Sequence, residues 1–223
     1  MNRKLPFLLL FLLARLAVFG QGLWKLNTDK DGIKIYTAQI PDSKIKAIKV
    51  ECEVEASPSQ LVALLMDVNT STDWLYHTKT CRLIKQVSPA EIYYYSEVNL
   101  PWPAENRDFV AHLTVKQNPD TKVITIDGPA VPGMVPEKKG VVRIEHSTGK
   151  WTITPCGPAL VKVEYTLHTE PGGNIPAWMV NMFATQGPLQ VFENLKQQVQ
   201  KPAYKNAVLS YIENPGSRLY SKL

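Results

Sequence analysis

Strand-like segments follow one another through the middle of the chain, and a single long helical pattern comes after them. Short connections rich in Pro, Gly, Asp or Asn join these segments, as is typical of antiparallel strands. After them, residues 176–199 carry apolar side chains at spacings of three and four, which predicts an amphipathic helix. This order predicts an α+β fold in which a C-terminal helix covers one curved antiparallel sheet. The strand patterns lie at residues 82–87, 91–100, 107–117, 123–127, 141–146, 150–155 and 160–169.

Two more strand patterns and a helix start precede this region. Residues 48–56 alternate between apolar and charged side chains, which indicates a half-buried strand, and the shorter pattern at residues 33–40 should pair with it. Ser57 then stands before Pro58, and Gln60 lies three positions after Ser57. Such a serine cap with proline at the first position predicts that a helix begins here.

The C-terminal helix is predicted to be irregular. Pro188 follows Gly187 near its middle, removes one backbone hydrogen bond and crowds the carbonyl of Ala184, so we expect a kink. A shorter helix is predicted over residues 203–213. One helix laid across a sheet of this size does not fill the concavity, and the sequence therefore predicts an internal cavity.

The N-terminus has the pattern of a secretory signal. Arg3 and Lys4 precede an uninterrupted apolar run at residues 5–13, and small residues follow where a signal peptidase would cut. The alternative is a membrane anchor, but this run is far shorter than the roughly 20 residues that span a bilayer. We expect export to the periplasm or the cell exterior. The expected parts are a signal peptide at 1–20, a folded domain at 21–201 and a helical extension with a tail at 202–223.

Charge and cysteine content exclude several classes of function. The chain has 25 basic and 20 acidic side chains, and three of the basic ones lie in the first 20 residues. Without those 20 residues the chain has 22 basic and 20 acidic side chains, which gives a net charge of +2. Nucleic-acid binding is not expected, because it needs clustered basic side chains. Cys52, Cys81 and Cys156 match neither a zinc site nor a CxxC motif. Cys52 lies on the apolar face of its strand, which predicts a buried structural thiol.

Four blocks of sequence occur in a distinctive order and spacing. They are PWPAENRDFV at 101–110, PEKKGVVR at 136–143, WTITP at 151–155 and EPGGNIPAW at 170–178. Together they resemble the START domain family, the steroidogenic acute regulatory protein-related lipid transfer domains. The resemblance covers about residues 24–200.

The resemblance implies a helix-grip fold, in which a curved antiparallel sheet wraps the long C-terminal helix and a tunnel between them holds one lipid. Members of the family bind sterols, phospholipids or ceramides and use no metal or organic cofactor. Loops that correspond to residues 102–106 and 132–139, together with the C-terminal helix, are expected to gate the tunnel. The N-terminal helix of longer members is reduced here to a few residues after Leu23.

Arg107 is the main candidate for a polar anchor inside the tunnel. Its strand has an apolar face that begins with Phe109, and alternation places the guanidinium on that inward side. A buried cation is costly unless it is paired, so Arg107 needs a partner. Either Glu97 on the preceding strand or a polar group of the ligand would serve, and Glu97 shares its face with Tyr95. The alternative is that Arg107 only ties its strand to a loop or helix.

The remaining candidates are apolar. Trp178, Met182 and Phe183 lie at helical spacing, where plain core packing is the simpler interpretation. Met134 is an apolar side chain in a loop, and Trp102 stands between two prolines, where contact with a membrane surface is an alternative. The predicted ligand-binding residues are Arg107, Glu97, Tyr95, Trp102, Phe109, Met134, Trp178, Met182 and Phe183.

Catalytic patterns are sparse. The four histidines are scattered, and HExxH, GxSxG, CxxC and Gly-rich phosphate motifs do not occur. We therefore expect a non-enzymatic, monomeric lipid-binding or lipid-transfer protein that touches membranes transiently and needs no metal or cofactor. Two alternatives stay open: an enzyme on a related cavity fold, such as a cyclase or hydrolase of an aromatic or polyketide substrate, and a lipid sensor that reports to a partner.

Overall fold

One large sheet dominates the computed structural model, which describes residues 24–41, 43, 45–173 and 175–216. Within these residues, ten strands belong to this sheet, in the order β1-β2-β3-β10-β9-β7-β6-β5-β4, with β8 paired to β6 off that path. The strands are β1 (Lys25–Lys30), β2 (Ile33–Ala38), β3 (Ala47–Val54), β4 (Thr78–Ser88), β5 (Glu91–Val98), β6 (Asn106–Gln117), β7 (Ile124–Pro129), β8 (Val141–Arg143), β9 (His146–Pro155) and β10 (Val161–Glu170).

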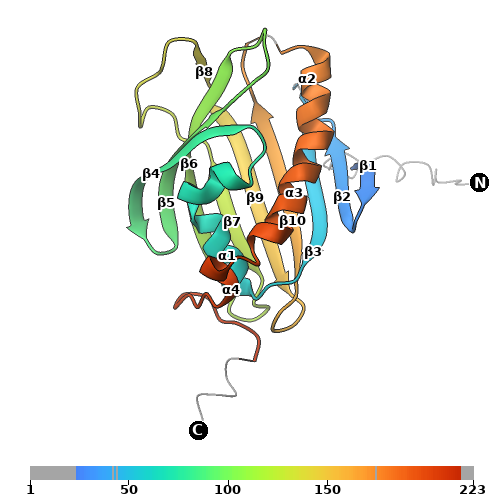
Figure 1. The fold of residues 1–223 in the computed structure, drawn as a ribbon, viewed down its shortest axis with the longest axis vertical. Coiled ribbons are helices and arrows are strands. Elements are labelled where there is room, and N and C mark those ends of the chain that lie inside the picture. Colours follow the sequence, from blue (N-terminus) through green and yellow to red (C-terminus); the bar gives the residue numbers. More distant parts are fainter. Residues whose placement is uncertain (1–23, 42, 44, 174, 217–223) are drawn as a thin grey trace, which may run out of the picture.

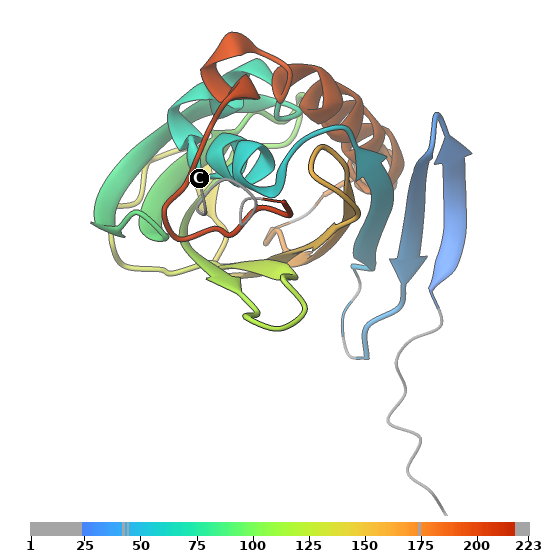
Figure 2. The same cartoon turned by 90° about the horizontal axis from the view of Figure 1, so that it is seen from below.

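All pairings along the main path are antiparallel, and several come from neighbouring segments of the chain. The central pairing of β3 with β10 joins the two halves, with Val50 opposite Tyr165 and Ile48 opposite Leu167. Because directly opposed residues share a face, these four side chains lie on one side of the sheet. That side is the concave one, which the helices cover (Figure 2).

The helices lie inside the curve of the sheet (Figures 1 and 2). Ser57 caps α1 through its side chain and forms a capping box with Gln60, as the sequence predicts. The C-terminal helical run crosses the concave face and packs Phe192 and Leu195 into the core. The helices are α1 (Pro58–Met66), the 3₁₀ helix η1 (Val68–Asp73), α2 (Ala177–Asn181), the π-helical turn η2 (Met182–Gln186), α3 (Gly187–Gln198) and α4 (Pro202–Lys205).

The main architectural predictions are confirmed, with local corrections. The curved sheet with its C-terminal helix is the helix-grip arrangement, and the regular hydrogen bonding of that helix is interrupted by η2 directly before Gly187-Pro188. The predicted strand at 141–146 shortens to β8, which runs parallel to β6. The predicted helix at 203–213 is wrong beyond α4. Strand β1 was not predicted, because its side chains are almost all exposed and do not alternate.

The three cysteines are all free thiols in the described chain. Cys52 is buried, as predicted, and burial raises the pKa of its thiol to about 11. The signal peptide expected at residues 1–20 lies outside the described residues.

Candidate functional site

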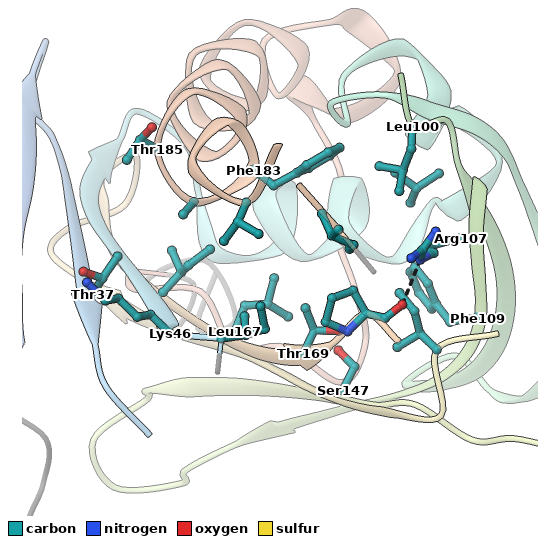
Figure 3. A pocket seen from close by; sticks show the side chains of 18 of the residues that line it. Thr37, Lys46, Leu100, Arg107, Phe109, Ser147, Leu167, Thr169, Phe183 and Thr185 are labelled. Carbon is teal, nitrogen blue, oxygen red and sulfur yellow. Dashed lines mark hydrogen bonds between the residues drawn. The ribbon is translucent and has the colours of Figure 1, made fainter. Parts of the chain in front are cut away.

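A cavity of about 620 Å³ lies between the concave face of the sheet and the α2–η2 segment (Figure 3). Apolar side chains from strands and helix dominate its wall, which is the usual composition of a site for a small apolar ligand. Figure 3 shows Phe183 on the helical side of the hollow and Leu167 on the sheet side. The lining residues are Asn27, Thr37, Ile45, Lys46, Ile48, Val98, Leu100, Arg107, Phe109, Ile144, Ser147, Tyr165, Leu167, Thr169, Pro171, Ile175, Val180, Phe183, Ala184 and Thr185.

Aromatic packing limits how far the cavity extends along α3. Tyr165 lines the cavity, and its ring packs against Trp151 and Phe192 at centroid distances of 4.3 and 6.2 Å. Phe192 is 1% exposed and belongs to the core. Burial raises the pKa of Tyr165 to about 12, so its hydroxyl stays protonated at neutral pH. The hollow is therefore confined to the part of the grip beside α2 and η2.

Arg107 lies in the cavity wall, as alternation predicts, and it is 4% exposed. Its three nitrogens donate to backbone carbonyls: Nε to Pro171 at 2.8 Å, Nη1 to Glu105 at 2.6 Å and Nη2 to Gly172 at 2.8 Å. No ion pair of Arg107 occurs among the described residues. Burial lowers the pKa of Arg107, although the charge of Glu105 opposes that shift. These contacts match the alternative in which Arg107 ties its strand to a loop.

The loop that Arg107 holds depends on glycine. Gly172 and Gly173 have φ angles of +65° and +59°, which lie in the left-handed region that other residues rarely adopt. A Cβ atom on Gly173 would also lie 3.2 Å from Arg107 Nη2. The glycine pair thus lets the backbone approach the guanidinium.

Of the two partners considered for Arg107, Glu97 is wrong. In the β5–β6 register Val98 is opposite Arg107, whereas Glu97 is opposite Asp108. Adjacent residues of a strand point to opposite faces, so Glu97 lies on the side of the sheet away from the cavity. Tyr95 lies there too and donates from its hydroxyl to Asp108 Oδ2 at 3.0 Å. Neither Glu97 nor Tyr95 lines the cavity.

Glu97 is the centre of an ion-pair cluster on this outer face. Its carboxylate accepts hydrogen bonds from Lys79 at 2.8 Å, Asn106 at 2.9 Å and Lys138 at 3.0 Å. The hydrogen bond from Lys79 is the main reason that the pKa of Glu97 falls to about 2, and Lys138 and Asn106 act in the same direction against the effect of burial.

Arg143 extends the same cluster to the loop between β7 and β8. Its guanidinium donates to both carboxylate oxygens of Asp108, at 2.6 and 3.1 Å, and to the carbonyls of Val135 and Pro136 at 3.2 Å. Together with Lys138 it holds residues 131–140 against β5 and β6. Asp108 and Arg143 were missed at the sequence level, although the alternation that sends Arg107 inward sends Asp108 outward.

The other predicted residues fall into two groups. Phe109 and Phe183 line the cavity with Arg107, while Met182 is partly buried and does not. Trp102, Trp178 and Met134 are 89%, 52% and 36% exposed and lie outside the wall, so core packing does not explain them. They come from the β5–β6 loop, α2 and the β7–β8 loop, which meet at the upper end of the molecule in Figure 1.

A polar corner of the cavity was not predicted. Asn27, Thr37 and Lys46 form it at the edge where β1, β2 and β3 meet the helical segment, and we call these three residues the lysine end. Asn27 Nδ2 donates to Thr37 Oγ1 at 2.8 Å. Figure 3 shows Thr37 and Lys46 opposite Arg107, at the other end of the hollow. Alternation along the sequence could have revealed this corner, because it places Lys46 on the same face as Ile48 and Val50.

Metal and membrane-spanning features are absent from the described part of the chain. No group of three or more His, Cys, Asp or Glu side chains there is arranged to hold a metal ion. No described helix has both the length and the apolar character needed to cross a bilayer.

Comparison with known proteins identifies the family. A START domain profile matches residues 12–205. The chain belongs to the START domain family. An uncharacterised protein of Pseudomonas aeruginosa is 35% identical to it over 178 residues, which cover 80% of this chain and 87% of the relative. The phosphatidylcholine transfer protein of Bos taurus is 30% identical over 170 residues, which cover 74% of this START protein and 78% of the relative.

A solved structure agrees with the fold. The STAR-related lipid transfer protein fragment from Xanthomonas axonopodis is 32% identical to this START domain, with a TM-score of 0.73. The match covers 80% of this chain and 99% of that fragment. Lipid transfer is part of the name of both the Bos taurus relative and the Xanthomonas axonopodis fragment.

Proposed function

We propose that this START protein holds one lipid molecule in the cavity beside α2 and η2 and carries it between membranes. The supporting observation is the hollow itself, because about 620 Å³ is left open between sheet and helix and its wall is mainly apolar. Removing apolar surface from water contributes about 25 cal/mol per Å², so this wall retains an acyl chain or a ring system without further chemistry.

The composition of the wall favours binding over catalysis. Among the described residues that line the cavity there is no Asp, Glu, His or Cys. Acid–base or nucleophilic catalysis on a cyclase or hydrolase substrate would need such groups within hydrogen-bond reach of the reacting atoms. Arg107 is engaged with three carbonyls, and the pKa of Tyr165 lies too high for it to act as a base.

Transfer requires contact with a membrane, and the proposed contact surface is the end that carries Trp102, Met134 and Trp178. Tryptophan is favoured at membrane interfaces because its ring is apolar and its N–H is polar. A monomer suffices for this task, since the cavity is built from a single chain.

Export is also proposed, on the basis of Arg3 and Lys4 before the apolar run at residues 5–13. Fractionation of cells that express the whole chain or a version without residues 1–20 tests it. Only the whole chain should reach the exported fraction.

Native mass spectrometry of the purified protein tests the lipid-carrying function. A lipid adduct at one molecule per chain is expected, and protein stripped of lipid should extract a replacement from vesicles. Protein that is repeatedly recovered empty and that extracts nothing would contradict the proposal.

A further inference from the structure

The size of the cavity restricts what it can enclose. A cavity of about 620 Å³ lies within the range of about 300–1,000 Å³ that is typical of pockets for small ligands. One long acyl chain with a small headgroup is a ligand of that size. Phosphatidylcholine has two such chains together with glycerol and a large headgroup, and it is larger than the ligands that pockets of this size usually enclose. The tight aromatic packing of Tyr165, Trp151 and Phe192 stops the hollow from extending further along α3.

The charges in the wall restrict the ligand further. Lys46 and Arg107 both line the cavity, and none of the described lining residues is acidic. The wall therefore carries two positive charges and no opposing negative charge. Arg107 is buried, so its charge acts in a low-dielectric environment, whereas Lys46 is exposed and its charge is weakened by water; both favour an anion over a neutral or cationic group.

The two cations are not equivalent as binding groups. Each nitrogen of Arg107 already donates to a backbone carbonyl, and these contacts fix the guanidinium in place. Lys46 has no hydrogen bond and no ion pair among the described residues. Its ammonium keeps all three donors available, and it is the compact charge that suits a carboxylate or a phosphate.

The lysine end supplies neighbouring polar groups. Thr37 is 5% exposed, and its hydroxyl oxygen accepts from Asn27, which leaves the hydroxyl proton to donate. In the β2–β3 register Thr37 is opposite Ile48, so its side chain lies on the cavity face. An ammonium and a hydroxyl thus lie together at one corner, while Phe183 on the helical side and Leu167 on the sheet side give the hollow apolar walls between this corner and Arg107.

We propose that the ligand is a single-chain acidic amphiphile, with its carboxylate or phosphate at the lysine end and its chain extended across the hollow past Leu167 and Phe183 toward Phe109. This inference rests on the proposed lipid-carrying function and names the class of lipid. It separates this chain from a carrier of two-chain neutral phospholipids.

Matched probes test the headgroup. Palmitate, hexadecanol and hexadecyl phosphate share one chain, and native mass spectrometry of lipid-free protein gives their relative affinities. Palmitate and hexadecyl phosphate should each bind about tenfold tighter than hexadecanol, which is the effect of one charge-assisted hydrogen bond at a partly exposed site. The advantage should shrink as salt is added. Equal affinities for palmitate and hexadecanol would overturn the inference.

Variants of Lys46 test the site. Lys46→Gln should weaken palmitate about tenfold and leave hexadecanol unchanged, and Lys46→Glu should reverse the preference toward hexadecylamine. Lys34→Gln is the matched control, because Lys34 is exposed on the face of β2 that points away from the cavity. Lys46 is itself exposed, so neither Lys46→Gln nor Lys46→Glu should disturb folding, and circular dichroism checks this. An unchanged preference in both Lys46 variants would overturn the assignment.

Vesicles of phosphatidylcholine distinguish a failure of the inferred lipid class from a failure of the lipid-carrying function. No extraction of phosphatidylcholine is expected. If the protein extracts it, or binds hexadecanol as well as palmitate, the inference about headgroup and size fails while lipid carrying stands. If no probe binds at all, the proposed function fails as well.

Discussion

Arg107 joins the start of β6 to the loop after β10 through three hydrogen bonds to carbonyl oxygens. A guanidinium is well suited to this task, since its donors form a rigid fork and its charge strengthens each bond. Its burial without a carboxylate is tolerated because polarised carbonyls surround it. The main role of Arg107 is therefore to hold the cavity wall in shape. Its charge contributes to the positive potential of that wall, but it does not bind the ligand directly.

Arg107→Leu should lower the free energy of unfolding by about 3 kcal/mol, because three carbonyl groups lose a charged donor and their loop loses its attachment. Urea unfolding measures this loss. Lys85→Gln, at an exposed position of β4, should change the value by less than about 0.5 kcal/mol. Unchanged stability together with lost palmitate binding would contradict the structural role and make Arg107 a ligand anchor.

The segment at residues 131–140 is the element most dependent on charge. Lys138 and Arg143 attach it to Glu97 and Asp108, and these acids are 3% and 1% exposed. Glu97 binds Lys138 on this segment, Lys79 on β4 and Asn106 on β6. Protonation of Glu97 should therefore loosen the whole attachment.

Acid is expected to weaken this attachment in a defined pH range. The pKa of Glu97 is about 2 in the folded protein, below its ordinary value of 4.5, so its stabilisation is complete above pH 4.5 and is lost as the pH falls toward 2. Glu97→Gln should lower stability at pH 7 on the order of 2 kcal/mol and flatten the acid dependence. Hydrogen exchange of residues 131–140 follows the loosening directly. Glu53→Gln, at an exposed position of β3, should leave both measurements unchanged, and an acid dependence that survives Glu97→Gln would disprove the assignment.

Strands that bury one face could be predicted well from the sequence, and strands without a buried face could not. Alternation in β3 and β10 placed Val50 and Tyr165 on the concave face, because burying one face specifies the strand. The exposed strand β1 carries no such pattern. Strand β8 was given the wrong length, because its pairing with β6 and the contacts of Arg143 involve residues that are distant in sequence.

The candidate site was predicted in part for the same reason. Alternation placed Arg107 and Phe109 on the inward face, whereas Phe183 lines the cavity although core packing was the simpler interpretation of its helical spacing. Alternation did not show that the carbonyls of the β10–α2 loop would reach Arg107 before Glu97 did, since loop paths depend on tertiary packing. Lys46 was overlooked because it precedes the regular part of β3, although its parity with Ile48 already placed it inward.

The whole molecule is asymmetric along its long axis. Helix α1 and α4 lie at the lower end in Figure 1, whereas α2 and the β5–β6 and β7–β8 loops lie at the upper end. The cavity wall draws on the ends of strands that reach this upper end, including Arg107 near the start of β6 and Thr169 near the end of β10. The exposed side chains of Trp102 and Trp178 thus lie at the end that is proposed as the membrane contact.

If this end meets the membrane, the two tryptophans should control the rate of transfer and not the affinity for the ligand. Neither lines the cavity, and burying an aromatic ring at the interface contributes roughly 1.5–3 kcal/mol at most. The double variant Trp102→Ala/Trp178→Ala should therefore move a fluorescent fatty acid between vesicles at least about tenfold more slowly, with its equilibrium occupancy unchanged. Val208→Ala is the control, because Val208 is 82% exposed and follows α4 at the opposite end. A transfer rate unaffected by the double variant would exclude this end as the docking surface, whereas a parallel loss of occupancy would place the tryptophans in the binding site itself.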